Sequence, residues 1–281
     1  MFTTNHAEQT SNGKLTGLGE RVLQKPLAAE MTPPQPLLAT REMHYHAGRE
    51  ERWHAHEVAQ LVLCTQGVMR VQTQTASWTL TPGRALWLPG TLPHALTALS
   101  DIRSTSLYLD PKLARAFWPQ ARSMLISPLL QALIQALVDI ELQPQPELDR
   151  VALISPLLLD EIHRAADGPV CNLPLPSDRR LLNICQQLLA SPASSDTLEE
   201  WGQRVGASSR TLARLFREQT GITFTQWRQQ LRLSEALVQL AQGQTVLRTA
   251  NQLGYQSPSA FISMFRRLMG ETPQRFLRIS A

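Results

Sequence analysis

The spacing of hydrophobic residues changes near residue 110. Between residues 37 and 110, short apolar and β-branched runs are separated by glycine and proline, as in SWTLTPG and ALWLPG. Several short strands at this spacing are typical of an all-β sandwich or barrel. The pattern therefore predicts a β-domain over residues 37–112.

Two longer apolar stretches with a helical period follow, at residues 128–142 and 148–166. The breaker Pro144-Gln145-Pro146 separates them, which predicts an antiparallel helical hairpin within residues 113–167. The hairpin has more apolar surface than one small sandwich needs. Packing of the hairpin against the β-domain is one explanation for this surface.

From residue 178 onward every segment has the length and period of a helix, after a proline-rich segment, residues 168–177, that we interpret as a linker. Thr197 and Glu200 form a capping box, and Ser208 can cap the next helix. About 48 residues later the design recurs, with Thr245 and Ser257 as caps. The repeat predicts two helix-turn-helix units, residues 198–219 and 246–269, joined by a helix from Phe224 to about Ala241.

Charge is distributed unevenly along the chain. Residues 1–176 have 14 Lys and Arg against 16 Asp and Glu, whereas residues 177–281 have 13 arginines against 7 acidic residues. This contrast predicts an anionic partner for the C-terminal half.

Residues 1–36 are polar and are expected to form a flexible arm. Three cysteines, no long apolar stretch and no apolar leader segment favour a cytoplasmic protein without a membrane span.

The second helix of each unit has one apolar and one exposed face. In the first unit Arg210, Arg214 and Arg217 lie at i, i+4 and i+7, opposite an apolar stripe. Guanidinium groups on an exposed helix face suit phosphate contacts and bidentate contacts to guanine. In the second unit the predicted exposed residues are Ser259, Ile262, Ser263, Arg266 and Arg267, and the two arginines are candidates for phosphate contacts.

The C-terminal part, about residues 178–278, resembles the DNA-binding domain of the AraC/XylS family of bacterial transcription regulators. The resemblance rests on SSRTLARLFREQTGITFTQWRQQLRLSEALVQL and on TANQLGYQSPSAFISMFRRLMGETPQRFL. It implies two recognition helices in successive major grooves, with Arg210, Ala213 and Arg214 reading bases in one and Ser259, Ile262 and Ser263 in the other. Two small residues, Ala213 and Ser263, and the pair Trp201-Gly202 depart from the family pattern.

The N-terminal part resembles a cupin jelly roll. The string Gly48-x5-His54-x-His56-x3-Gln60-x6-Gly67 is similar to the first cupin motif, with Gln where Glu is usual, and Gly83-x5-Pro89-x4-His94 is similar to the second. On a predicted strand, His54, His56 and Gln60 share one face. Cupins that bind a metal do so through three imidazoles and a carboxylate at these positions, whereas sensor cupins of AraC-like regulators often keep the histidines to line an effector pocket.

Two function classes remain open. A ligand-responsive regulator, with duplex DNA and a small-molecule effector as partners, accounts for both halves of the chain. The resemblance adds a homodimer and, for an activator, RNA polymerase. A metal-dependent cupin oxygenase or isomerase using His54, His56 and His94 leaves the basic helical half unexplained. We therefore expect an α+β multidomain regulator without catalytic residues and with no assured metal cofactor.

Overall fold

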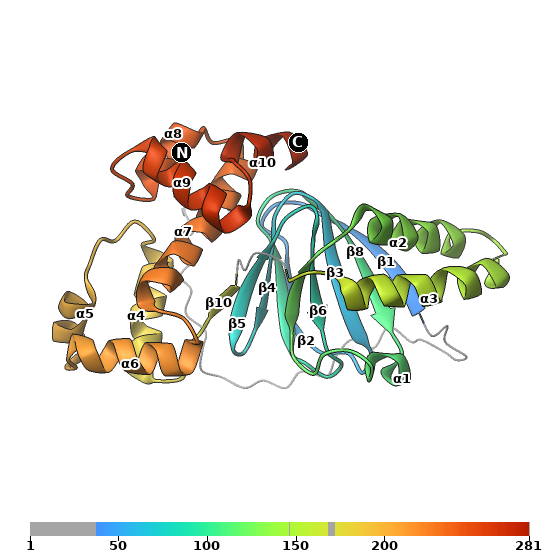
Figure 1. Cartoon of the computed structure of the whole chain (residues 1–281), viewed down its shortest axis with the longest axis horizontal. Coiled ribbons are helices and arrows are strands. Elements are labelled where there is room, and N and C mark those ends of the chain that lie inside the picture. Colours follow the sequence, from blue (N-terminus) through green and yellow to red (C-terminus); the bar gives the residue numbers. More distant parts are fainter. Residues whose placement is uncertain (1–37, 146, 168–171, 281) are drawn as a thin grey trace, which may run out of the picture. The chain divides into compact units, whose positions relative to one another are not determined.

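A computed structural model describes residues 38–145, 147–167 and 172–280. It contains a β-sandwich, a helical hairpin and an all-helical C-terminal part (Figure 1), so the predicted fold class is confirmed. The segment 1–36, expected to be an arm, lies outside the described residues.

Two five-stranded antiparallel sheets form the sandwich. The first sheet has the order β1-β8-β3-β6-β9 and the second the order β10-β5-β4-β7-β2. The strands are β1 (Leu38–Tyr45), β2 (Glu50–His54), β3 (Ala59–Gln66), β4 (Met69–Thr73), β5 (Ala76–Leu80), β6 (Arg84–Leu88), β7 (His94–Ala98), β8 (Ile102–Leu109), β9 (Arg122–Leu125) and β10 (Asn172–Pro174).

Alternating side chains of the first sheet enter two different cores. Val62 and Leu86 pack with Val71 of the second sheet, between the two sheets. Their neighbours Leu61 and Trp87 belong to a second core on the opposite face of the first sheet, which includes helical residues. Because both faces of β3 are covered, its sequence is a continuous apolar run rather than an alternating one.

The hairpin helices α2 (Pro128–Glu141) and α3 (Leu148–Arg164) cover that outer face. The Ser127 hydroxyl begins α2 by accepting the Leu130 N–H at 3.0 Å and donates to the Glu161 carboxylate of α3 at 2.7 Å. The buried side chains of the hairpin include Leu130, Ile134, Leu137, Leu158 and Ile162. The hairpin therefore packs against the sandwich, and it leaves other leucines in solvent.

Three short elements were not predicted. Helix α1 (Pro111–Ala114) crosses the predicted boundary between the β-domain and the hairpin segment. Strand β9 lies within the segment assigned to the hairpin and pairs with β6. Residues 172–174 were assigned to the linker, but they form β10, which pairs with β5. That interpretation was wrong for this segment because Pro174 is tolerated on an edge strand, and Leu173 is buried there.

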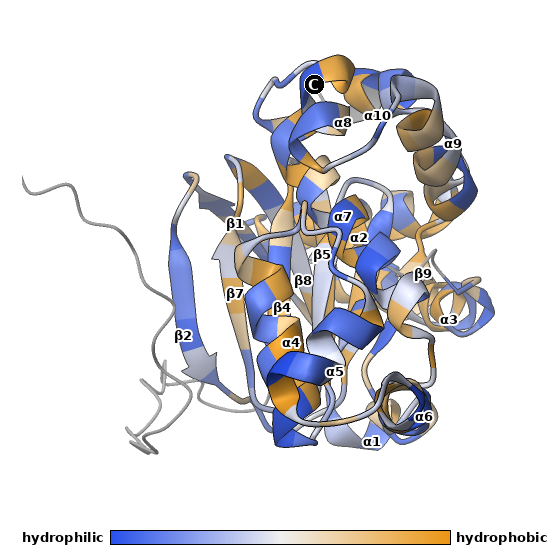
Figure 2. Cartoon of the chain, turned by 90° about the vertical axis from the view of Figure 1, so that its left-hand side faces the viewer, coloured by the Kyte–Doolittle hydropathy of each residue, from blue (hydrophilic) through white to orange (hydrophobic). Residues whose placement is uncertain are grey.

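The C-terminal part consists of seven helices. They are α4 (Arg179–Ala190), α5 (Leu198–Val205), α6 (Ser209–Thr220), α7 (Phe224–Ala241), α8 (Val246–Gln252), α9 (Pro258–Met269) and α10 (Pro273–Ser280). Figure 2 shows hydrophobic and hydrophilic residues alternating along α4. Helix α7 contributes to the apolar cores on both sides, with Trp227 and Leu231 in one and Leu237 and Leu240 in the other. It therefore connects the two helix-turn-helix units as a shared, buried spacer.

Helix α7 also contacts the outer face of the second sheet. The hydroxyls of Thr79 on β5 and Ser234 on α7 lie 2.6 Å apart and both are buried. Arg70 of β4 forms an ion pair with Glu235 of α7 at 3.0 Å. The spacer between the two units is thus bonded directly to the β-domain.

Candidate functional site

The first helix-turn-helix unit is formed by α5 and α6, and its caps are those predicted. Thr197 and Glu200 form the capping box, with the Thr197 N–H donating to the Glu200 carboxylate at 2.6 Å. Ser208 caps α6 through its hydroxyl. Gly206 ends α5 with φ of +69°, a left-handed conformation that favours glycine. The turn between the helices is therefore specified by local sequence.

The unusual pair Trp201-Gly202 is accommodated inside this unit. Trp201 is buried, and the Arg204 guanidinium lies 4.6 Å from the centre of its ring. A Cβ atom at Gly202 would lie 2.4 Å from the carbonyl oxygen of Ala207. Glycine at position 202 thus allows α5 to approach the turn that leads into α6.

The exposed face of α6 carries all the predicted contact residues of the first unit. Arg210, Ala213, Arg214 and Arg217 are exposed. Arg214 is bound by Glu218, a partner that was not predicted from the sequence. The Arg214 Nη1 donates to both oxygens of the Glu218 carboxylate at 2.8 Å. The i, i+4 spacing of Arg214 and Glu218 was the available signal for this ion pair.

The second unit, α8 and α9, presents a less charged face. Ser257 caps α9 and Pro258 occupies its first turn, as predicted. Among the candidate contact residues, Ser259, Ser263, Arg266 and Arg267 are exposed. Ile262, which was expected on the exposed face, is half-buried against the apolar core of this unit.

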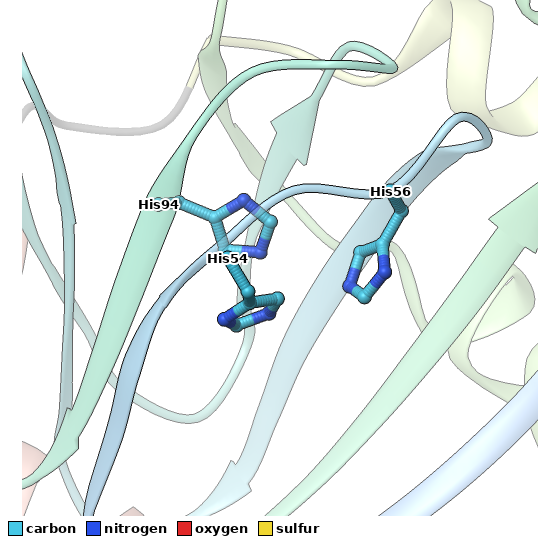
Figure 3. Close-up of side chains that lie close together, drawn as sticks. All are labelled: His54, His56 and His94. Atoms are coloured by element: carbon cyan, nitrogen blue, oxygen red, sulfur yellow. The ribbon is translucent and has the colours of Figure 1, made fainter. Parts of the chain in front are cut away.

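The N-terminal site is a cluster of the three predicted histidines (Figure 3). One imidazole nitrogen from each of His54, His56 and His94 lies within 4.8 Å of the others. The ring centres of His54 and His94 are 4.4 Å apart, and those of His54 and His56 are 4.9 Å apart. The structure thus brings these three side chains together, whereas their role stays a prediction.

The predicted reason for this clustering was wrong. His54 is the last residue of β2 and lies opposite His94 of β7, but His56 lies in the connection between β2 and β3. Gln60 belongs to β3, in the other sheet. The strand ends after His54, so a period of two along one strand does not explain the arrangement. The connection folds His56 back toward the other two rings.

Hydrogen bonds orient two of the imidazoles. The Nδ1 atom of His54 lies 2.8 Å from the carbonyl oxygen of Arg52, and that of His94 lies 2.9 Å from the carbonyl oxygen of Leu92. A carbonyl accepts only from a protonated nitrogen, so in each neutral ring Nε2 keeps its lone pair. Burial lowers the pKa of His94 to about 4, and burial together with His54 lowers the pKa of His56. His56 and His94 therefore present neutral nitrogen acceptors at pH 7.

Gln60 lies on the inner face of β3, with 5% of its surface exposed. Its Nε2 donates to the hydroxyls of Ser106 at 2.9 Å and Tyr108 at 3.3 Å, while its Oε1 has no partner. The Tyr108 ring contacts His56, with ring centres 5.6 Å apart. Tyr108 thus connects Gln60 to the histidines, and Ser106 accepts a second hydrogen bond from Gln60. Neither residue was predicted from the sequence, although both occur in the alternating run STSLYLDP of β8.

Two family models match the chain. An AraC-like ligand binding domain matches residues 38–166, and a helix-turn-helix domain matches residues 201–279. The first range contains the histidine cluster and the second contains α6 and α9. The histidine cluster therefore lies within the ligand-binding model, and the two candidate recognition helices lie within the helix-turn-helix model.

Relatives with assigned functions are transcription regulators. The chain is 32% identical over 235 residues to the HTH-type transcriptional regulator NimR of Escherichia coli, covering 83% of this chain and 85% of that protein. It is 35% identical over 119 residues to the regulator RipA of Corynebacterium glutamicum, covering 42% of this chain and 36% of RipA. The similarity to NimR extends across both domain models.

Among solved structures, ToxT from Vibrio cholerae is similar over 87% of this chain and 99% of its own, at 12% identity and a TM-score of 0.37. In the part of the chain that the structure describes, no helix is long and apolar enough to cross a membrane.

Proposed function

Because the chain belongs to the AraC family of transcription regulators, we propose that α6 and α9 together read one operator and that the histidine cluster receives the effector that controls this reading. The chain is a DNA-binding regulator with a ligand-binding N-terminal domain. The proposal adds which residues make these contacts. Its main support is the pair of capped helices α6 and α9 attached to one buried spacer, α7.

Base reading is assigned mainly to α6. Arg210 and Arg214 are long donors on its exposed face and suit guanine edges in the major groove, beside the small Ala213. On α9, Ser259 and Ser263 can reach base edges and Ile262 can pack against a thymine methyl group. We assign phosphate contacts to Arg217, Arg266 and Arg267.

The length of α7 sets the operator geometry. Two recognition helices fixed to one stiff spacer should bind half-elements about one helical turn, or about 10 bp, apart. An insertion of about 5 bp between the half-elements should reduce affinity to the non-specific level, because it rotates one groove to the far side of the duplex. Arg214→Ala should relax specificity at one base pair. The matched control is Arg164→Ala on α3, which should leave specificity unchanged. Unchanged affinity after the insertion would contradict binding by both helices.

The histidine cluster fits an effector that donates hydrogen bonds. The neutral imidazoles of His56 and His94 and the unpartnered Gln60 Oε1 are acceptors, so a ligand with N–H or O–H groups would satisfy them. His56→Ala should abolish the effect of the effector on DNA binding and leave effector-free affinity near wild type. A loss of DNA binding by this variant with its fold intact would contradict the assignment.

A divalent transition metal is a second candidate ligand. Imidazoles whose Nδ1 atoms bond to backbone carbonyls are oriented as metal-binding histidines usually are, with Nε2 available. His54, His56 and His94 would hold such an ion. The ligand atoms of this cluster include no carboxylate, and Gln60 is a weaker donor than Glu. Titration calorimetry with Zn²⁺ and Ni²⁺ tests this candidate, and binding that persists in His94→Gln would argue against it.

The remaining partners follow from the exposed surface and the relatives. Leu148, Leu153 and Leu157 of α3 are exposed, which supports a homodimer through the hairpin. Contact with RNA polymerase applies if the chain is an activator, and the place of action is the cytoplasm. No catalytic activity is part of the proposal, since the relatives that share most of the chain are regulators.

A further inference from the structure

A basic cleft lies between α7 and α9, with a volume of about 350 Å³. Arg228, Gln229 and Arg232 line it from α7, Ser263 and Arg267 from α9, and Tyr255 from the turn before α9. None of the residues that line the cleft is acidic. The cleft therefore combines three guanidinium groups with polar side chains and no carboxylate.

Neutral oxygens hold these arginines in place. Arg228 donates to the carbonyl oxygen of Asp196 at 3.0 Å, and Arg267 donates to the Gln229 amide oxygen at 2.8 Å. Arg232 donates to three carbonyl oxygens in the loop between α4 and α5. These acceptors carry no net charge. The Asp196 carboxylate, which is not part of the lining and pairs with Arg204, also attracts Arg228, so the positive charge of the cleft is only partly offset.

The three cations act electrostatically on the Tyr255 side chain. Burial raises the pKa of Tyr255, and the charges of Arg232, Arg267 and Arg228 act in the opposite direction. The Arg232 guanidinium lies 5.3 Å from the centre of the Tyr255 ring. A bound anion here would meet convergent positive charge and a hydroxyl donor, the combination that binds a phosphate oxygen well.

The position of the cleft suggests which anion it binds. Ser263 is one of the proposed reading residues of α9 and Arg267 follows it by one helical turn, and α7 joins the units that contain α6 and α9. A duplex that offers successive major grooves to α6 and α9 presents the backbone of the intervening minor groove to the spacer between them. We propose that this cleft binds a backbone phosphate between the two half-elements. The inference rests on the proposed reading by α6 and α9.

Neutral methylphosphonate linkages, placed one at a time across an operator fragment, test the proposal. A neutral linkage at one or two positions between the half-elements should weaken binding of the wild-type chain by about tenfold. In Arg267→Gln the same linkages should have little further effect, and the slope of log affinity against log salt should fall by about one unit. Arg275→Gln on α10 is the control, an exposed arginine outside the cleft.

Three results would overturn the proposal. Insensitivity of the wild-type chain to every neutral linkage between the half-elements would exclude a phosphate there. If neutral linkages weakened binding of Arg267→Gln as much as binding of the wild-type chain, that phosphate would be bound by another residue. A saturable thermal stabilisation of the DNA-free chain by inorganic phosphate, lost in Arg267→Gln, would assign the cleft to a free anion. Base substitutions in the half-elements test the proposed function separately. They impair binding whenever α6 and α9 read DNA, whether or not the cleft binds a phosphate.

Discussion

His94 should make the stability of the chain depend on pH in a defined window. Burial lowers its pKa from the ordinary value of 6.5 to about 4. Between these values the unfolded chain binds more protons than the folded one, so stability is complete above about pH 6.5 and declines as the pH falls toward 4. At pH 5 the difference of about 1.5 pK units corresponds to a loss of about 2 kcal/mol.

Urea unfolding at pH 7.5 and pH 5 measures this loss when wild type is compared with His94→Gln. The variant lacks the titrating ring, so its stability should fall by about 2 kcal/mol less over the same interval. His46→Gln is the matched control, because the His46 side chain is 98% exposed. Titrating groups outside the histidine cluster contribute equally to wild type and variants, and the comparison cancels them.

If the free energy of unfolding fell equally with pH in wild type and in His94→Gln, His94 would not be the cause of the loss. An NMR titration of the histidine ring protons provides the midpoint directly, without requiring that the variant folds normally. A midpoint near 6.5 for His94 would show that its ring is solvated rather than buried. Acceptors at Nε2 would then be lost at mildly acidic pH, which would undermine the proposed recognition of hydrogen-bond donors.

Three further changes test other contacts. Glu218→Gln should raise DNA affinity several-fold in gel-shift assays because it releases the Arg214 guanidinium and removes a negative charge; weaker binding would show that Glu218 positions Arg214 for reading. Gly202→Ala should lower stability by about 1–3 kcal/mol in thermal unfolding, since the added methyl group meets a carbonyl oxygen; an unchanged Tm would contradict this. Thr79→Val and Ser234→Ala should show a coupling of about 1 kcal/mol in a double-mutant cycle of unfolding, and independent effects would show that the two hydroxyls are not bonded.

The helical half could be predicted closely because local chemistry determines it. The cap residues Thr197, Ser208, Thr245 and Ser257 set the helix starts, and left-handed glycines such as Gly221 set the ends. These signals act within four residues along the chain. They required no knowledge of which segments lie together in space.

Contacts between distant segments could not be predicted in this way. The pairing of β10 with β5 joins residues almost 100 positions apart, and the Gln60–Tyr108 bond crosses between two strands. The spacing of the histidines identified the cluster through its resemblance to a cupin motif, whereas the period-two argument placed His56 on the wrong element. Burial of Ile262 depends on the core beneath α9, which a helical wheel alone does not define.

Strand β4 links the histidine cluster to the DNA-binding part. Its Thr73 lies opposite His94 in the second sheet, and its Arg70 bonds to Glu235 of α7. An effector can change DNA affinity only if it binds one arrangement of the chain more tightly than another. A displacement of β4 on effector binding would act on α7, which sets the separation of α6 and α9. Linkage is reciprocal, so operator DNA must then change effector affinity by the same factor. Breaking the Arg70–Glu235 ion pair should reduce both effects together.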